Sequence, residues 1–254
     1  MIRIVFLGTG AGSPSLSRWA LSTAIVYDSL IGLLDCGEGC QIRLQQRGIS
    51  PLKIRFVAVT HLHGDHVIGL LPLLQTMTLF NRKDVLEIIG PKDLKDLVEL
   101  FMKISRHKTS FNIIYKDPLE KISYNDKIFI KGFETCHTIE SYGYLIEIKY
   151  KKDLFKICFT GDTGPCENVV MNCKDVDILI HDATFLSEHR DEASASGHST
   201  VEDAAKTALE ANVKKLYLTH ISSRYNDEKK ILGEAKKVFK ESYLANDLDE
   251  IIIF

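Results

Sequence analysis

The sequence contains no apolar run that approaches the length of a membrane-spanning helix. Its first residues, 2–7, read as a β-strand that leads into glycines, and they lack the basic segment and cleavage site of a secretory leader. These two absences argue against a membrane protein and indicate a protein of the cytoplasm.

The chain also lacks a charge imbalance. It carries 32 basic and 34 acidic side chains, for a formal net charge of −2 over 254 residues. Because proteins that hold nucleic acid through bulk charge are strongly basic, any contact with RNA or DNA must come from local basic patches. A hydrophobic content of 45% is ample for a sizeable core in a folded protein of this length.

Cysteine is present without a recognisable pattern. The six cysteines form no CxxC pair and no dense framework, which favours reduced and mostly buried thiols over a disulfide scaffold. They are Cys36, Cys40, Cys136, Cys158, Cys166 and Cys173.

Strand-like and helix-like stretches alternate along the chain without a low-complexity linker. The expected strands are 3–7, 22–27, 32–35, 55–60, 86–89, 111–115, 127–133, 141–149, 155–160, 178–180, 215–219 and 250–254. The expected helices are 38–47, 65–80, 91–105, 200–211 and 227–241. Both halves of the chain are rich in strands and then close with helices. This order predicts an α/β fold in which two sheets pack together with helices outside, in one domain spanning 1–254.

Residues 60–66 read THLHGDH and directly follow the apolar run 54–59. If the strand conformation persists, His61 and His63 point the same way, while Asp65 and His66 begin the next helix. Imidazole nitrogen with carboxylate oxygen is the donor set of zinc and, to a lesser degree, of manganese or iron. Because thiolate ligands are missing, an open catalytic metal site is favoured over a closed structural one.

One motif does not supply enough ligands to coordinate two metal ions. Three further candidate ligands lie at the ends of expected strands, where loops begin. His137 lies in FETCHT, Asp162 in FTGDTG and His220 in YLTHISSRY. Loops at strand ends are the usual position of chemistry in layered folds. Each residue alone could be a cap or a surface residue, but together with the first motif they predict a metal centre.

The pattern HxHxDH, a lone His, Gly-Asp and a final His resembles that of the metallo-β-lactamase superfamily. The flanking sequence resembles ribonuclease Z, the endonuclease that trims the 3′ trailer from precursor tRNA. The segments that carry the resemblance are FLGTGAGSPS at 6–15, LLDCGEG at 33–39, THLHGDHVIGLLPLL at 60–74, FTGDT at 159–163, LIHDATF at 179–185, GHSTVEDAA at 197–205 and LTHISSRY at 218–225. The resemblance implies the αβ/βα sandwich of that superfamily, with two packed mixed sheets and helices on the outer faces.

The resemblance also implies a ligand set for two Zn²⁺ ions per subunit, with Mn²⁺ or another divalent metal as an alternative. One ion would be held by His61, His63 and His137, and the other by Asp65, His66 and His220, with Asp162 bridging both. Two such ions can activate a shared water and neutralise charge on a phosphodiester, which fits hydrolysis of that bond. The resemblance implies that the bond is the one on the 3′ side of the tRNA discriminator base.

Three residues are candidates for proton transfer. Asp65 would accept the proton of the attacking water, or would only orient it. His198 in GHST matches the histidine that in ribonuclease Z contacts the scissile phosphate and protonates the leaving 3′ oxygen. Asp182 in HDATF occupies the place of a family glutamate that orients this histidine, and its side chain is one methylene shorter.

Two departures from the family bear on the substrate. The family's PxKxRN stretch is PSLSRWA at 14–20, which keeps Arg18 but not the lysine or the asparagine. A long tRNA-binding arm that most members insert between the positions of His137 and Asp162 is missing or reduced to KYKKD. RNA binding would then depend on local basic clusters and on a ring such as Trp19, Tyr142 or Tyr144, for which core packing is the competing explanation.

Several alternatives remain open. A phosphodiesterase for small or cyclic nucleotides on the same dimetal site is favoured by the missing arm. An inactive binding partner is disfavoured by the intact ligands, and a nicotinamide enzyme by Ser13 and Pro14 in GTGAGSP, where a third glycine and a helix should follow. A di-iron redox enzyme is disfavoured because a glutamate usually stands at the position of His63.

Ribonuclease Z relatives are mostly homodimers, and the resemblance predicts a homodimer here as well. The segments 37–50 and 69–80 could form the contact, since the second carries more apolar residues than one helix face normally needs. These residues are Leu70, Leu71, Leu73, Leu74, Met77 and Leu79. Core packing is the competing explanation.

Overall fold

The computed structural model describes residues 1–253, which form two compact units. The first unit consists of residues 1–117 together with the C-terminal segment that starts at Asn246. The second unit runs from Pro118 to Ala245. Each unit contains one seven-stranded sheet and its own helices.

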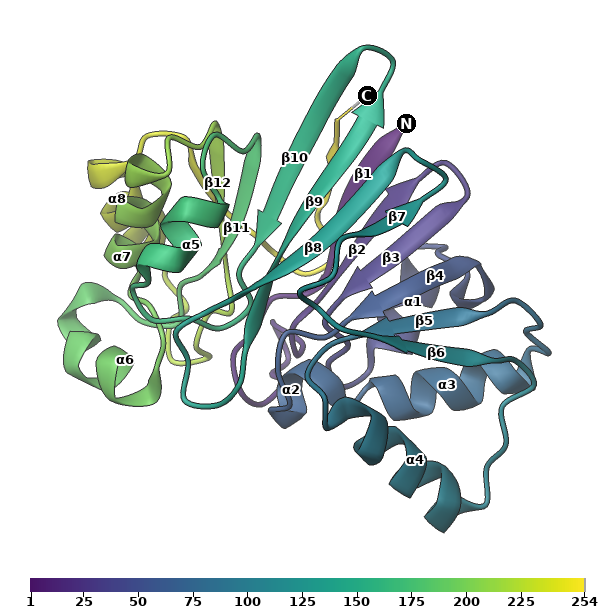
Figure 1. Cartoon of the computed structure of the whole chain (residues 1–254). Helices are drawn as coiled ribbons and strands as arrows, with labels where there is room; N and C mark the ends of the chain where they lie inside the picture. Colours follow the sequence, from purple (N-terminus) through teal and green to yellow (C-terminus); the bar gives the residue numbers. More distant parts are fainter. Residues whose placement is uncertain (254) are drawn as a thin grey trace. The chain divides into compact units, whose positions relative to one another are not determined.

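The sheet of the first unit has the strand order β14-β1-β2-β3-β4-β5-β6 (Figure 1). The strands are β1 (Ile2–Gly8), β2 (Ser22–Tyr27), β3 (Leu30–Leu34), β4 (Ile54–Ala58), β5 (Leu86–Ile89), β6 (Ile113–Lys116) and β14 (Glu250–Ile252). Pairing is antiparallel from β14 to β3 and parallel from β3 to β6. Strand β5 reads LEII and is buried along its whole length, as expected of a strand in the parallel part of a sheet.

Helices of the first unit pack on this sheet and form its core. They are α1 (Cys40–Gln46), α2 (Gly64–Val67), α3 (Leu70–Leu79) and α4 (Leu94–Ser105), with the 3-10 turn η1 (Pro51–Lys53) before β4. Leucines of α1, α3 and α4 join alternate strand residues such as Leu33 and Val57 in one apolar cluster. Helix α3 accommodates Pro72 because that residue lies in its first turn, where the missing N–H has no helical partner.

The sheet of the second unit has the strand order β13-β12-β11-β10-β9-β8-β7. The strands are β7 (Ile122–Tyr124), β8 (Ile128–Glu134), β9 (Tyr142–Tyr150), β10 (Asp153–Phe159), β11 (Ile178–Asp182), β12 (Lys215–Thr219) and β13 (Ser242–Leu244). The helices are α5 (Glu167–Asn172), α6 (Arg190–Ser196), α7 (Val201–Glu210) and α8 (Glu228–Val238), with the 3-10 turn η2 (Ser187–His189) before α6. Apolar residues of α5, α7 and α8 pack with Leu179 and Leu216 of the sheet.

The two units repeat one topology. In each sheet three antiparallel pairs are followed by three parallel pairs. The helices enter at corresponding points, since α1 follows β3 as α5 follows β10, and α4 follows β5 as α8 follows β12. Loops at the carboxyl ends of the parallel strands are therefore equivalent positions in the two units, and most of the candidate ligands lie on them.

The sequence-based expectations for fold class are confirmed, with two mixed sheets that carry helices. All twelve expected strands and all five expected helical segments are present within a few residues of their bounds, although the segment 65–80 is divided into α2 and α3. Strands β7 and β13 and helices α5 and α6 were not expected. No helix among residues 1–253 is both long enough and apolar enough to span a bilayer.

The expectation of six reduced thiols is wrong for four of them. Disulfides join Cys136 to Cys166 and Cys158 to Cys173. Cys166 and Cys173 flank the short helix α5 as its N-cap and C-cap residues, so both ends of α5 are tied to the second unit's sheet and its loops. Their partners lie 30 and 15 residues away in the sequence, and only the fold brings them together.

Candidate metal centre

The first ligand cluster, His61, His63, Asp65 and His66, follows strand β4 and enters α2. His63 is the N-cap residue of that helix in extended conformation, so the chain turns from a strand into a helix within the motif. His61 and His66 are fully buried. His61 Nε2 lies 3.0 Å from His63 Nδ1, and the rings of His61 and His66 are 4.1 Å apart between centroids.

A buried carboxylate that the sequence analysis did not single out holds this cluster. Asp35 follows β3 with a left-handed backbone (φ 56°) and is fully buried. Its carboxylate accepts hydrogen bonds from the Thr60 N–H (2.7 Å), the Thr60 hydroxyl (3.0 Å) and His66 Nδ1 (2.7 Å). Burial raises the pKa of Asp35, while the charge and hydrogen bond of His66 and the bonds from Thr60 oppose that rise.

These contacts decide which nitrogen of each imidazole carries the proton. His66 Nδ1 faces a carboxylate, so it must be a protonated nitrogen, and in the neutral imidazole Nε2, which lies 3.5 Å from Asp65 Oδ2, then carries the lone pair. The Thr60 hydroxyl donates its single hydrogen to Asp35, so it must accept a hydrogen bond from His61 Nδ1, 3.0 Å away. His61 Nε2 therefore also presents a lone pair, and both nitrogens are ready to bind a metal.

Asp65 is oriented by the N-terminal loop of its own unit. The N–H of Gly12 donates to Asp65 Oδ2 at 2.8 Å, and Gly12 has a left-handed φ of 67° that favours glycine. The same loop is fixed by Arg18, which is 8% exposed and donates to Thr9 (2.6 Å) and to Asn246 (2.8 Å). Arg18 thus faces inward and stabilises the loop that carries Gly12.

Packing accounts for the three rings considered as base-stacking residues. Trp19 lies on the backbone of Gly39, where an added Cβ would stand only 2.0 Å from the ring, and the Arg43 guanidinium lies over it. Tyr142 and Tyr144 are buried in strand β9. The two tyrosines therefore pack in the core, and Trp19 packs against Gly39 and Arg43.

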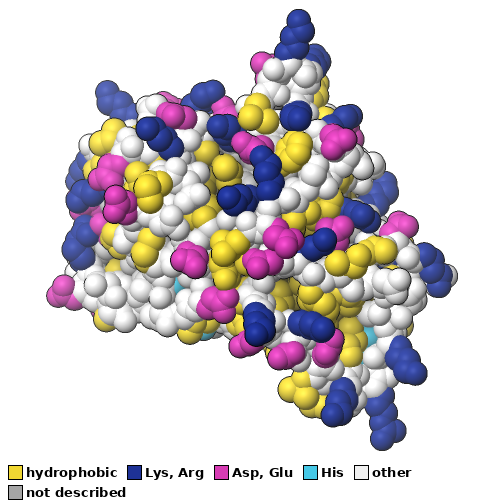
Figure 2. All heavy atoms as spheres, in the orientation of Figure 1, with side chains coloured by type: hydrophobic (Ala, Val, Ile, Leu, Met, Phe, Trp, Pro, Cys, Tyr) yellow, Lys and Arg dark blue, Asp and Glu magenta, His cyan; other side chains and the backbone are white. Residues whose placement is uncertain are grey.

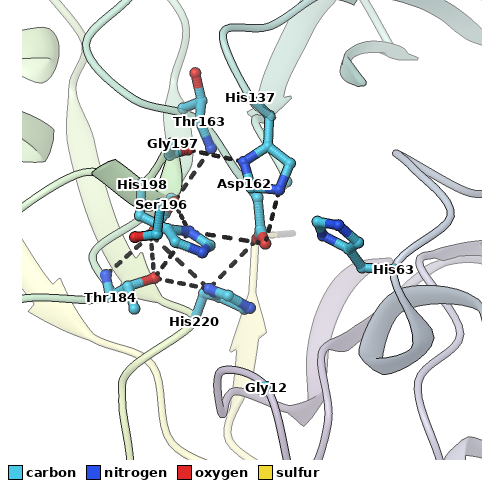
Figure 3. A network of polar contacts seen from close by, with 12 residues as sticks. Gly12, His63, His137, Asp162, Thr163, Thr184, Ser196, Gly197, His198 and His220 are labelled. Atoms are coloured by element: carbon cyan, nitrogen blue, oxygen red, sulfur yellow. Dashed lines mark hydrogen bonds and ion pairs between the residues drawn. The ribbon is translucent and has the colours of Figure 1, made fainter. Parts of the chain in front are cut away.

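The second ligand cluster, His137, Asp162, His198 and His220, lies within the second unit (Figure 3). His137 Nδ1 donates to the carbonyl oxygen of Gly197 at 2.8 Å, so in the neutral imidazole Nε2 is the nitrogen that carries the lone pair. Asp162 follows β10 and is 2% exposed. His220 follows β12 with a left-handed φ of 56°, a conformation uncommon for histidine, and lies 3.4 Å from Asp162 between Nδ1 and Oδ1.

Asp182 is the second buried carboxylate, at the end of β11, and it contacts His198 directly. Its Oδ2 lies 2.9 Å from His198 Nδ1 and also accepts the N–H of Thr163, while Oδ1 accepts the N–H of Thr184. Burial works to raise the pKa of Asp182, but the positive charge and hydrogen bond of His198 outweigh it and hold the pKa below its usual range. Because the distance is 2.9 Å, the aspartate side chain contacts His198 without an intervening water, although it is one methylene shorter than the family's glutamate.

A capped helix fixes the segment that contains His198. The Thr200 hydroxyl caps α7 in a capping box with Asp203, and Asp203 also accepts a hydrogen bond from Arg190 at 2.6 Å. Ser199, just before the cap, donates its hydroxyl to the carbonyl of Thr163 at 2.6 Å. These contacts hold the GHST segment beside Asp182.

The residues present fit a divalent cation by their chemistry. In the second unit, Asp162, Asp182, His198 and His220 have ligand atoms within 4.8 Å of one another. In the first unit, His61 Nε2 and His63 Nδ1 converge at 3.0 Å, with the His61 nitrogen unprotonated. Nitrogen and oxygen donors without thiolates are the set expected for zinc or manganese at a catalytic site.

Comparison with known proteins identifies the family. Residues 32–221 match the model of the β-lactamase superfamily domain. The chain is 41% identical to ribonuclease Z from Saccharolobus islandicus and 38% identical to that from Sulfurisphaera tokodaii, over 100% of this chain and 100% and 99% of theirs. The chain belongs to the ribonuclease Z family. A crystal structure of the short form of human tRNase Z superposes with a TM-score of 0.86 at 32% identity, covering 99% of each chain, and the fold is that of the metallo-β-lactamases.

The chain is shorter than its ribonuclease Z relatives. The alignment with the Saccharolobus islandicus protein spans 297 positions, and this chain has 254 residues, so at least 43 positions of the relative have no counterpart here. Between His137 and Asp162 the structure contains only the hairpin of β9 and β10, whose turn consists of Lys151 and Lys152. The expected absence of a long arm at this position is confirmed. Basic side chains mark the tip of this hairpin at the top of Figure 2, whereas basic and acidic groups are mixed over the rest of that face.

Residues that orient the ligands are the ones that the sequence analysis missed. Asp35, Thr60 and Thr184 each contact a histidine of the expected ligand set. A signal existed for Asp35, because it follows a buried apolar strand as Asp162 does and lies in the family-like segment LLDCGEG. Thr60 and Thr184 also lie in family-like segments, THLHGDH and LIHDATF, but their partners could not be read from the sequence because only the fold defines them.

Proposed function

We propose that this protein is a metal-dependent endoribonuclease that cleaves precursor tRNA on the 3′ side of the discriminator base. The observation that carries the proposal is the full-length identity of 41% to ribonuclease Z, together with the two imidazoles of His66 and His137, whose Nδ1 atoms are hydrogen-bonded to Asp35 and to Gly197. The two units are proposed to work as one catalytic domain.

The proposed ligand set is the one implied by the family. One Zn²⁺ would be held by His61, His63 and His137, the second by Asp65, His66 and His220, with Asp162 shared. The donor types and the tautomers support this assignment, and Mn²⁺ would suit the same donors. When bound, the two cations lower the pKa of a water and neutralise charge on the attacked phosphodiester.

The chain's own residues move the protons. Asp65, oriented by the Gly12 N–H, accepts the proton of the water that attacks phosphorus. His198 is held through Nδ1 by Asp182, which leaves Nε2 to deliver a proton to the departing 3′ oxygen of the tRNA. The bond between phosphorus and that oxygen breaks, so the tRNA keeps a 3′ hydroxyl and the trailer keeps the phosphate. The ionised Asp182 stabilises the protonated form of His198 before the transfer.

The decisive experiment offers precursor tRNA and a chromogenic small diester to the purified protein with zinc or manganese. We expect a preference for the tRNA of several orders of magnitude, with a cut after the discriminator base. His63→Ala should abolish cleavage, whereas His107→Ala, a change at a histidine beyond the end of α4, should not. The reverse substrate preference would overturn the proposal in favour of a phosphodiesterase for small nucleotides, which the short hairpin of β9 and β10 favours.

We also propose a homodimer that acts in the cytoplasm, where its RNA substrate would be found. Of the five leucines and one methionine of segment 69–80, five residues are buried in the core of the first unit and Leu79 is exposed, at 81%. Leu79 and its neighbour Phe80, which is 53% exposed, are the residues proposed to contact a second copy. Light scattering of Leu79→Glu should show a monomer where the parent protein is a dimer, and a monomeric parent protein would refute the proposal.

A further inference from the structure

Thr184 lies beside His198 and His220 of the second unit (Figure 3), and it also contacts the carboxylate of Asp182. Its Oγ1 is 2.6 Å from Asp182 Oδ1, 2.8 Å from His220 Nδ1 and 3.3 Å from His198 Nδ1. The residue is 5% exposed, so water does not compete freely for these bonds. Three polar partners thus share one hydroxyl in a buried position.

A hydroxyl has a single hydrogen to donate, and this fixes the direction of each bond. Asp182 Oδ1 can only accept, and at 2.6 Å it must receive the hydrogen of Thr184. The oxygen of Thr184 then faces His220 Nδ1 with a lone pair, so His220 Nδ1 must carry a hydrogen and donate it. The opposite tautomer would leave Thr184 Oγ1 and Asp182 Oδ1 at 2.6 Å without a hydrogen between them, which is repulsive.

His198 depends less on this hydroxyl. Its Nδ1 is 2.9 Å from Asp182 Oδ2, which is closer than the 3.3 Å to Thr184. Asp182 therefore uses one oxygen for His198 directly and the other for His220 through Thr184. The first unit contains the same arrangement, since Asp35 holds His66 directly and His61 through the hydroxyl of Thr60.

We propose that Thr184 is a positioning residue that fixes the tautomer and ring orientation of His220, so that its Nε2 carries the lone pair that would bind a metal ion. The inference rests on the proposed dimetal function and extends it to a residue outside the ligand set. Partners of this kind, which hold the second nitrogen of a ligand histidine, change metal affinity by about 10- to 100-fold when they are removed.

The test compares Thr184→Val, which has the same shape without the hydroxyl, with Thr184→Ser, which restores it. In Thr184→Val, Asp182 keeps its bonds from Thr163 and from the backbone of residue 184, and thermal melts of all three proteins establish that each is folded. The ¹⁵N spectrum of the metal-free protein gives the tautomer of His220. Titration with Zn²⁺ or Co²⁺, followed by calorimetry and by the Co²⁺ absorption spectrum, gives affinity and stoichiometry.

We expect the parent protein and Thr184→Ser to show His220 with hydrogen on Nδ1. Thr184→Val should show a mixture of tautomers and bind one of the two ions about 10- to 100-fold more weakly, with an altered Co²⁺ spectrum. Affinity and tautomer in Thr184→Val equal to those of the parent, or hydrogen on Nε2 in the parent, would overturn the inference. None of these readouts uses RNA, so a failure to cleave precursor tRNA would refute the proposed function without touching this result.

Discussion

Replacing Asp35 with asparagine should disable two metal ligands at once while leaving the first unit folded. Asparagine tolerates the left-handed backbone that Asp35 adopts, and its carbonyl oxygen can still accept the Thr60 N–H. The amide nitrogen, however, would stand where Oδ2 accepts hydrogen bonds from the Thr60 hydroxyl and from His66. At both contacts an acceptor becomes a donor.

This exchange reverses two tautomers. His66 Nδ1 can bond to an amide N–H only as an acceptor, which moves its hydrogen to Nε2. The Thr60 hydroxyl, once it accepts from the amide, must donate to His61 Nδ1, which moves the hydrogen of His61 to Nε2 as well. Each Nε2 must then lose a proton before it can bind a metal. Because each disturbed partner costs about 10- to 100-fold in metal affinity, the two together should cost about 100-fold or more.

The stability of Asp35→Asn should fall much less steeply than its metal affinity. Bonds to a charged acceptor contribute about 1.5–3 kcal/mol each, but the amide remakes hydrogen bonds at the same positions with reversed direction. We expect the free energy of unfolding of the metal-free protein to fall by about 2 kcal/mol, which most domains of 5–15 kcal/mol survive. Urea unfolding and zinc calorimetry on the same sample separate the two effects.

Asp247→Asn is the matched control. Asp247 is another carboxylate of the first unit, with a side chain that is 8% exposed, and it accepts hydrogen bonds from Thr9, Trp19 and Arg43 but from no histidine among residues 1–253. Its replacement should destabilise the unit comparably and leave the affinity for zinc near that of the parent. If Asp35→Asn binds zinc as the parent does, or if Asp247→Asn weakens zinc binding equally, the tautomer reasoning is refuted.

Three further predictions concern stability and pH. Thr200→Ala should lower the free energy of unfolding by about 2 kcal/mol in urea melts, because it removes the cap of α7 and a buried partner of Asp203; an unchanged midpoint would contradict the capping role. Replacing both Cys158 and Cys173 with alanine should lower the free energy of unfolding by about 3 kcal/mol under oxidising conditions, because that disulfide closes a loop of 15 residues. Thiol titration of the unfolded parent protein should find two free thiols among its six cysteines. Burial and the charge of Glu99 raise the pKa of Tyr115 to about 12, so the folded state keeps this proton while the unfolded chain loses it near pH 10. Stability should therefore fall between pH 10 and 12, by about 1 kcal/mol after allowance for solvent screening of a partly exposed side chain, and Tyr115→Phe should lack this part of the loss.

The regular elements could be predicted because their signals are local. Strand 215–219 and strand 22–27 have the expected bounds, since apolar β-branched runs between turn residues are read directly from the sequence. Strands β7 and β13 have three residues each and helix α6 is rich in Ser and Ala, so their patterns are too short or too weak for the same reasoning. They form because neighbouring strands and helices stabilise them.

The candidate site residues also differ in whether a local sequence signal predicts them. His61, His63, Asp65 and His66 could be predicted together because they are close in sequence. The disulfide between Cys136 and Cys166 could not, since pairing across 30 residues depends on the turn of the chain after β8 and the start of α5. Arg18 is read from the sequence as a remnant of an RNA-handling motif, yet in the structure it is enclosed by the loop that it stabilises.

The duplicated topology does not duplicate the chemistry. Asp35 follows β3 and is hydrogen-bonded to Thr60, whereas its equivalent after β10 in the second unit is Asp162, a proposed ligand. In the second unit the carboxylate that contacts the histidines is Asp182, at the end of the next strand β11. Thr184 donates its hydroxyl to Asp182 as Thr60 does to Asp35. The same substitution should then act differently at equivalent positions: Asp35→Asn changes tautomers, whereas Asp162→Asn removes a charge that faces His220 directly. The role of a residue in one unit can therefore be assigned to its equivalent in the other unit only from the contacts of its side chain. An equivalent position at the end of a strand determines where a carboxylate lies, but not which group it faces.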